Sequence, residues 1–148
     1  MAENHSSGDL HQRIYKQLLL VIPHLEGIAE HGKSVVPGYM DLNLDILRCS
    51  KDKTVIALSH YYKHRGDMIA DPDMVVAVYP DRAMAEALTY QDCFRFVEVY
   101  SQGGRLVDIR AKRELNSFLI HWLNNLRIQG HCIHSLVGVV PGKDVACA

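Results

Sequence analysis

The brevity of most connections between the strand-like segments constrains the fold more than any other feature of the sequence. Alternation of apolar and polar residues begins in "YMDLNLDIL", where Met40, Leu42, Leu44 and Ile46 share one face. The strand-like segments that follow are "TVIALSHYY", "MVVAVY", "AMAEALTY", "CFRFVEVYS" and "RLVDI". Parallel neighbours need long crossover connections, so short turns predict an antiparallel meander.

Helical stripes flank these strands at both ends of the chain. Apolar residues recur at spacings of three and four from Leu10 to Ile28, and Pro23 should end the first helix near Val21. A second stripe, which Gly130 is placed to end, consists of Leu115, Phe118, Leu119, Trp122, Leu123 and Leu126. We therefore predict an α+β domain: a meandering antiparallel sheet of five or six strands with N- and C-terminal helices packed on one face.

The chain length of 148 residues suits one domain with a substantial core. We expect residues 1–8 to be disordered, residues 9–135 to form the domain, and residues 136–148 to form a C-terminal tail. The N-terminus "MAENHSSGDLHQR" does not resemble a secretory signal, and the longest apolar run, "LLLVI", cannot span a bilayer. These features predict a cytoplasmic protein that does not engage a membrane.

The charge balance and the motif content argue against several function classes. Sixteen Lys and Arg residues nearly match seventeen Asp and Glu residues, which gives no general attraction to nucleic acid. The sequence contains no Gly-rich phosphate loop, nucleophile elbow or kinase signature. It therefore identifies no catalytic residue and no cofactor, and it favours a binding protein over an enzyme.

The stretch "LSHYYKHRGDMIADPDM" concentrates residue types that bind metals or transfer protons. His60 and His64 are its best metal candidates. However, His60 ends a predicted strand, where a spacing of four separates side chains by about 13 Å. The Asp67, Asp71 and Asp73 run lacks the closing Glu of a calcium loop. A solvated polar loop with a hydrogen-bonded His60 is the favoured interpretation, and no metal site is predicted.

Glu86 lies on the same face of its predicted strand as apolar residues, at every second position. A carboxylate buried on that face must be paired or neutralised. A tight bend after Tyr90 would place Glu86 diagonally across from Arg95. One interpretation is an ion pair that fixes the strand register. The other is a small-ligand pocket, or the active site of an enzyme, floored by that pair with Tyr79 and Asp81 near its rim.

A longer pattern resembles the bacterial YqiB-like family of domains of unknown function, over about residues 15 to 130. The matching residues are Pro72, Met74, Val76, Tyr79, Asp81, Ala85-Glu86, Phe94-Arg95-Phe96, Asn116, Phe118-Leu119, Trp122-Leu123 and Gly130. The stretch "LSHYYKHRGDMIADPDM" further resembles a related domain often carried on bacterial plasmids and integrative elements. The resemblance implies a cytoplasmic bacterial protein and the helix–sheet–helix order, and it supplies no activity.

The function that best fits these observations is an accessory role through contact with another protein. Ile120 and Ile128 lie off the main stripe of the last helix, so we expect them to be exposed and to form a partner surface. If the gene lies on a mobile element, an inhibitor of a host system would be one such role. The alternative remains a ligand-binding protein or enzyme that uses Asp81, Glu86 and Arg95.

Overall fold

The structure is a computed structural model that describes residues 7–134. Two long helices enclose a series of strands in the chain, with two single turns of 3-10 helix between them. The elements in chain order are α1 (Ser7–Val21), η2 (Leu25–Gly27), β1 (His31–Ser34), β2 (Leu42–Cys49), β3 (Thr54–His64), β4 (Asp67–Tyr79), η3 (Pro80–Arg82), β5 (Met84–Gln91), β6 (Phe96–Glu98), β7 (Tyr100–Ser101), β8 (Leu106–Val107) and α2 (Ile109–Gln129).

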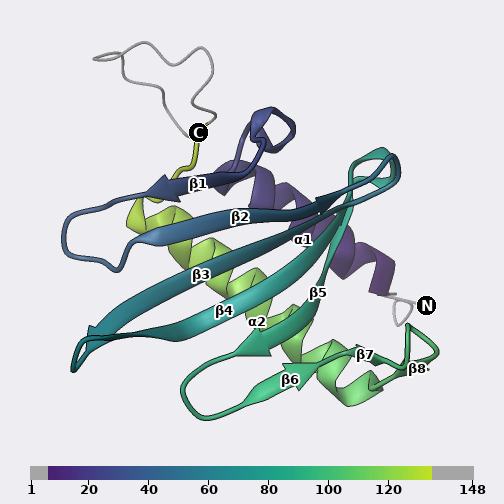
Figure 1. Cartoon of the computed structure of the whole chain (residues 1–148). Coiled ribbons are helices and arrows are strands. Elements are labelled where there is room, and N and C mark those ends of the chain that lie inside the picture. The colour runs from purple at the N-terminus through teal and green to yellow at the C-terminus, as the bar shows by residue number, and fades with distance from the viewer. Residues whose placement is uncertain (1–6, 135–148) are drawn as a thin grey trace.

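Strands β1 to β6 form one antiparallel sheet in which every strand lies beside its neighbours in the chain. Both helices lie behind the same face of the sheet, where α1 packs against α2 and both contact β5 (Figure 1). The core fills the space between these layers. Its largest fully buried side chains include Ile14, Leu44, Ile56, Met74 and Leu123. The predicted α+β meander with helices on one face is confirmed.

The helix ends follow from local chemistry. α1 ends at Val21, two residues before Pro23, as predicted. α2 begins after Asp108, whose carboxylate accepts a hydrogen bond of 2.9 Å from the backbone N–H of Ala111. It ends at Gly130, which adopts the left-handed conformation with φ of 96°. The described helices include none that is long and apolar enough to cross a membrane.

The stretch predicted as a polar loop is part of a long β-hairpin, and that prediction is wrong. β3 continues to His64 and β4 begins at Asp67. Arg65 and Gly66 between them have φ values of 54° and 87°, as a two-residue hairpin turn with two left-handed positions requires. The strands extend into a polar sequence, where no apolar alternation marks them.

Predictions at the sheet edges also need correction. β1 lies between the first helical stripe and the first strand-like segment, where no strand is predicted. It packs closely: a Cβ atom added to Gly32 would lie 2.5 Å from Cγ2 of Ile133. The predicted "RLVDI" strand does not complete the sheet. Only Leu106 and Val107 are extended, and they pair with β7 in a separate two-stranded ribbon, because Asp108 then caps α2.

The predicted domain boundaries are only partly within the described residues. α1 begins at Ser7, two residues before the expected start of the domain. The rest of the segment predicted to be disordered, and the predicted tail at 136–148, lie outside the described residues.

Candidate functional site

The predicted pairing of Glu86 with Arg95 is wrong. β5 and β6 pair with Tyr90 opposite Val97, so the strands are offset by four residues from the predicted register. Arg95 instead lies in the turn before β6, with its guanidinium 5.4 Å from the centre of the Tyr90 ring. The groove that Arg95 lines does not include Glu86 among its described lining residues.

Two tyrosine hydroxyls bind the Glu86 carboxylate in place of Arg95. Tyr79 donates to Oε2 at 2.8 Å, and Tyr100 donates to Oε1 at 2.6 Å. Burial, together with the hydrogen bond to Glu86, raises the pKa of both tyrosines above the usual value. The predicted pocket residues Tyr79 and Glu86 are therefore together, whereas Asp81 is exposed in η3 and Arg95 is elsewhere.

The two histidines considered as metal ligands do not share a site. His60 is buried, donates from Nδ1 to the carbonyl oxygen of Asp41 at 2.8 Å, and meets the Trp122 ring edge-on at 5.5 Å. His64 is exposed at the end of β3. Within residues 7–134, no group of three or more His, Cys, Asp and Glu side chains is arranged to hold a metal ion.

The two isoleucines expected to form a partner surface have different environments. Ile120 is only 9% exposed and belongs to the core, so its predicted exposure is wrong. It faces α1 across the helix pair, a direction that the stripe of a single helix does not reveal. Ile128 is 68% exposed, as expected, and its role in binding stays a prediction.

The turn between β5 and β6 presents the most exposed aromatic side chains of the described chain. Phe94 is 90% exposed and Phe96 is 57% exposed, on either side of Arg95. We call these three residues the aromatic tip. Asp92 fixes the backbone of the tip, because its Oδ1 accepts hydrogen bonds from the N–H groups of Phe94 and Arg95 at 2.8 and 3.0 Å.

Tyr90 connects the tip to the body of the protein. Its hydroxyl donates to Oδ2 of Asp92 at 2.6 Å, and its ring meets Phe118 of α2 edge-on at 5.3 Å. Burial and the bond to Asp92 raise the pKa of Tyr90 to about 12, and the same bond holds the pKa of Asp92 below its usual range. These contacts hold the tip in place against the body of the protein.

A groove of about 690 Å³ separates the tip from α2. We call it the tip groove. Its lining residues are Tyr90, Arg95, Arg113, Glu114, Leu115, Ser117, Phe118 and His121. The single carboxylate among them, Glu114, lies 3.5 Å from the guanidinium of Arg110, outside the groove lining. The groove thus combines aromatic walls with two arginines and a histidine.

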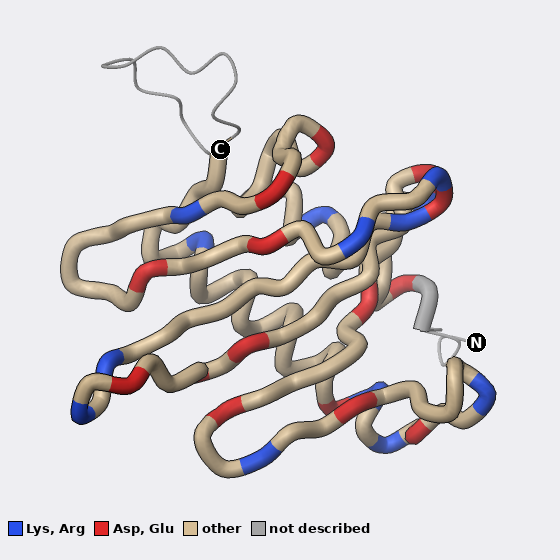
Figure 2. The backbone as a smooth tube through the Cα atoms, viewed as in Figure 1, with Lys and Arg blue, Asp and Glu red and all other residues tan. Residues whose placement is uncertain are grey.

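Charge elsewhere is dispersed. Figure 2 shows that the described Lys and Arg residues are scattered over turns, strands and helices and gather on no single face. A nucleic acid needs a continuous positive surface for its phosphates.

Sequence reasoning placed Phe94 and Phe96 in a strand and Phe118 in the core, so it missed that all three side chains are exposed. A signal was present: Asp92 two residues before Phe94 is typical of a turn in which the aspartate side chain binds the following N–H groups. Phe94 in this turn and Phe96 at the start of β6 both point away from the core and are exposed.

Comparison with known proteins gives one result. The family model described as a domain of unknown function, DUF6908, matches residues 13–132. No curated protein and no solved structure matches the chain. The resemblance to YqiB-like domains and to a mobile-element domain stays a prediction.

Proposed function

Because the chain belongs to the DUF6908 family of domains of unknown function, we propose its role from its own surface: it binds another protein through the aromatic tip and the tip groove. The observation that carries this proposal is Phe94, a large apolar side chain 90% exposed on a turn that hydrogen bonds hold in place. Burying one such side chain against a partner contributes about 1.5–3 kcal/mol.

The composition of the surface supports a protein partner. Aromatic and arginine side chains supply most of the energetically dominant contacts in protein interfaces. Here Phe94 and Phe96 flank Arg95, and Tyr90 and Phe118 line the adjacent groove. Binding costs less entropy when the contacting groups are already ordered, and Asp92 orders this turn in the free protein.

The chemistry of the groove favours a particular partner segment. Arg95, Arg113 and His121 line it, and Glu114, the one carboxylate among its described lining residues, is close to Arg110. An apolar side chain flanked by Asp or Glu would fill the aromatic space and pair with the arginines. We therefore propose a cytoplasmic protein partner that presents an acidic segment with an apolar anchor.

The alternative of a ligand pocket built from Asp81, Glu86 and Arg95 loses its support, because the tyrosines bind Glu86 and Arg95 lies at the tip. An inhibitor encoded on a mobile element would act through a protein-capture surface of the kind proposed here.

Affinity purification from a bacterial host that carries the gene, followed by mass spectrometry, tests the proposal. The baits are the wild-type chain and the double variant Phe94→Ser/Phe96→Ser. Met68→Ser is the matched control, because Met68 is also exposed but lies on β4 beside the β3–β4 turn. The exposed substitutions should leave the melting temperature unchanged.

We expect one protein to be retained by the wild type and by Met68→Ser and to be lost from the tip variant. With the purified partner, calorimetry should show affinity at least about tenfold weaker for the tip variant. Equal retention by all three baits, or equal loss from the tip variant and Met68→Ser, would contradict the proposal.

A further inference from the structure

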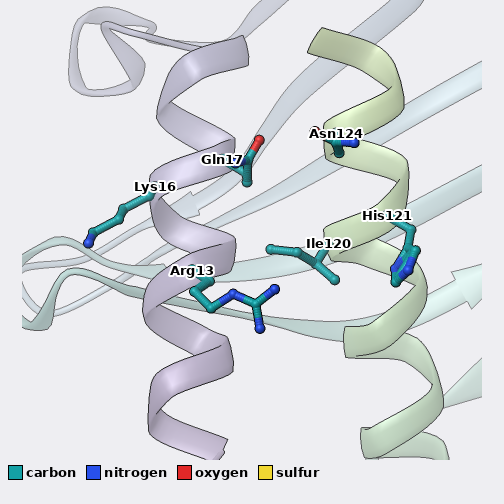
Figure 3. A pocket seen from close by; sticks show the side chains of 6 residues that line it. All are labelled: Arg13, Lys16, Gln17, Ile120, His121 and Asn124. Carbon is teal, nitrogen blue, oxygen red and sulfur yellow. The ribbon is translucent and has the colours of Figure 1, made fainter. Parts of the chain in front are cut away.

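A second groove, of about 270 Å³, lies between α1 and α2. Its lining residues are Arg13, Lys16, Gln17, Ile120, His121 and Asn124 (Figure 3). Ile120 points from α2 toward α1 and forms an apolar floor. The groove is independent of the aromatic tip, although His121 borders both grooves.

The polar groups above that floor are mostly donors. Figure 3 shows the guanidinium of Arg13 turned toward α2, whereas the Lys16 ammonium points away. Arg13 forms no ion pair and no side-chain hydrogen bond with the described residues. Oδ1 of Asn124 accepts a hydrogen bond from Arg127 at 2.8 Å, which leaves the Asn124 NH₂ group to donate.

None of the described residues that line this groove carries a carboxylate. A guanidinium without a counter-ion, in a groove that also presents an amide donor, can bind an oxyanion. The groove volume of about 270 Å³ is sufficient for a small anion.

Gln17 adds a requirement that a plain anion does not meet. Its Oε1 is buried and has no hydrogen-bond partner among the described residues, and an unsatisfied buried acceptor is destabilising. Gln17 lines the groove one helical turn along α1 from Arg13, and Figure 3 shows its amide oxygen directed away from the Arg13 guanidinium. A ligand that also carries a donor would satisfy this oxygen once the amide rotates toward it.

We propose that the α1–α2 groove binds a phosphate group that carries its own hydrogen-bond donor, either the hydroxyl of hydrogen phosphate or a hydroxyl of a small phosphate ester. Arg13 and Asn124 donate to the phosphate oxygens. Gln17 accepts from the hydroxyl. Sulfate has the same shape and charge class but carries no proton at neutral pH, so it should bind more weakly.

Titration of the full chain followed by amide NMR, at constant ionic strength, tests this site. The probes are inorganic phosphate, glycerol 3-phosphate and sulfate. The variants are Arg13→Gln and Gln17→Leu. Arg65→Gln in the exposed β3–β4 turn is the matched loss of one positive charge.

We expect saturable shifts at residues 13–17 and 120–124 with phosphate or its ester, and the tighter of the two identifies the source of the phosphate. Affinity should fall at least about tenfold in Arg13→Gln and stay unchanged in Arg65→Gln. Sulfate should bind at least about tenfold more weakly than phosphate to the wild type, and that preference should disappear in Gln17→Leu. Native-like spectra of the variants exclude unfolding as the cause of a loss.

Several results would overturn the proposal. The first is that neither phosphate probe saturates the protein by about 20 mM, and the second is that the chemical shifts change only in other segments. The third is that Arg65→Gln weakens phosphate affinity as much as Arg13→Gln does. The fourth is that sulfate and phosphate bind the wild type equally. The last would remove the role given to Gln17.

Discussion

The carboxylate of Glu86 offers the sharpest test of the structure, because sequence and structure assign it different partners. Tyr79→Phe and Tyr100→Phe each remove one hydroxyl donor, at 2.8 and 2.6 Å, and change little else. A hydrogen bond to a charged group contributes about 1.5–3 kcal/mol when buried. All three side chains are partly exposed, so water replaces part of the loss, and we expect about 1 kcal/mol for each variant.

The double variant should cost more than the two single changes together, because the first change leaves the carboxylate one donor and the second leaves it none. In a Glu86→Gln background, where the acceptor is neutral, each Tyr→Phe effect should be smaller. Arg95→Met should stay within about 0.5 kcal/mol of the wild type, since Arg95 is exposed in the turn.

Urea unfolding followed by the fluorescence of Trp122, the one tryptophan in the chain, measures these free energies. The reasoning is refuted if both Tyr→Phe variants match the wild type within about 0.3 kcal/mol while Arg95→Met costs more than about 1.5 kcal/mol. That outcome would restore the ion pair between Glu86 and Arg95.

Three further predictions concern stability. Trp122 is 7% exposed in the core, so Trp122→Ala should lower the free energy of unfolding by about 3–5 kcal/mol. A thermal melt like that of the wild type would contradict the placement of Trp122. Gly32→Ala should destabilise by about 1–3 kcal/mol in urea unfolding, because its methyl group would collide with Ile133, and Ile133→Ala should relieve the collision. Burial lowers the folded-state pKa of His131 and His11, so the stability they contribute is complete above about pH 6.5 and is lost as pH falls below it. His131→Gln should flatten that acid loss in melts at stepped pH, and an unchanged slope would argue against it.

The helices and strands that could be predicted from the sequence are those with one apolar face in the core and one polar face in solvent. The buried faces of α2 and β2 were predicted correctly because Leu123 and Leu44 must be buried. A shift of either element by one residue would expose these side chains. The end of the β3–β4 hairpin has no such constraint. Arg65 and Gly66 close it beyond the apolar part of either strand, so the periodicity that predicts strands is absent there.

The error in the β5–β6 register has a local cause. A shift of four residues keeps every side chain on its own face, so hydrophobic alternation cannot distinguish the two registers. The turn decides between them: Asp92 binds the N–H groups of Phe94 and Arg95, which moves the start of β6 to Phe96. Because of these contacts Arg95 lies at the tip and not in the predicted pocket with Glu86.

Both proposed sites are grooves along α2, at places where the adjacent element leaves part of the helix surface uncovered. On one side α2 faces the braced β5–β6 turn, and on the other it faces α1, with His121 at the margin of both grooves. A change at His121 would therefore disturb both sites and could not separate a lost partner from a lost anion. Phe94 and Phe96 lie only at the tip, whereas Arg13 and Gln17 lie only between the helices. A phosphate effect that survives Phe94→Ser/Phe96→Ser, and partner binding that survives Arg13→Gln, would establish that the two surfaces act independently.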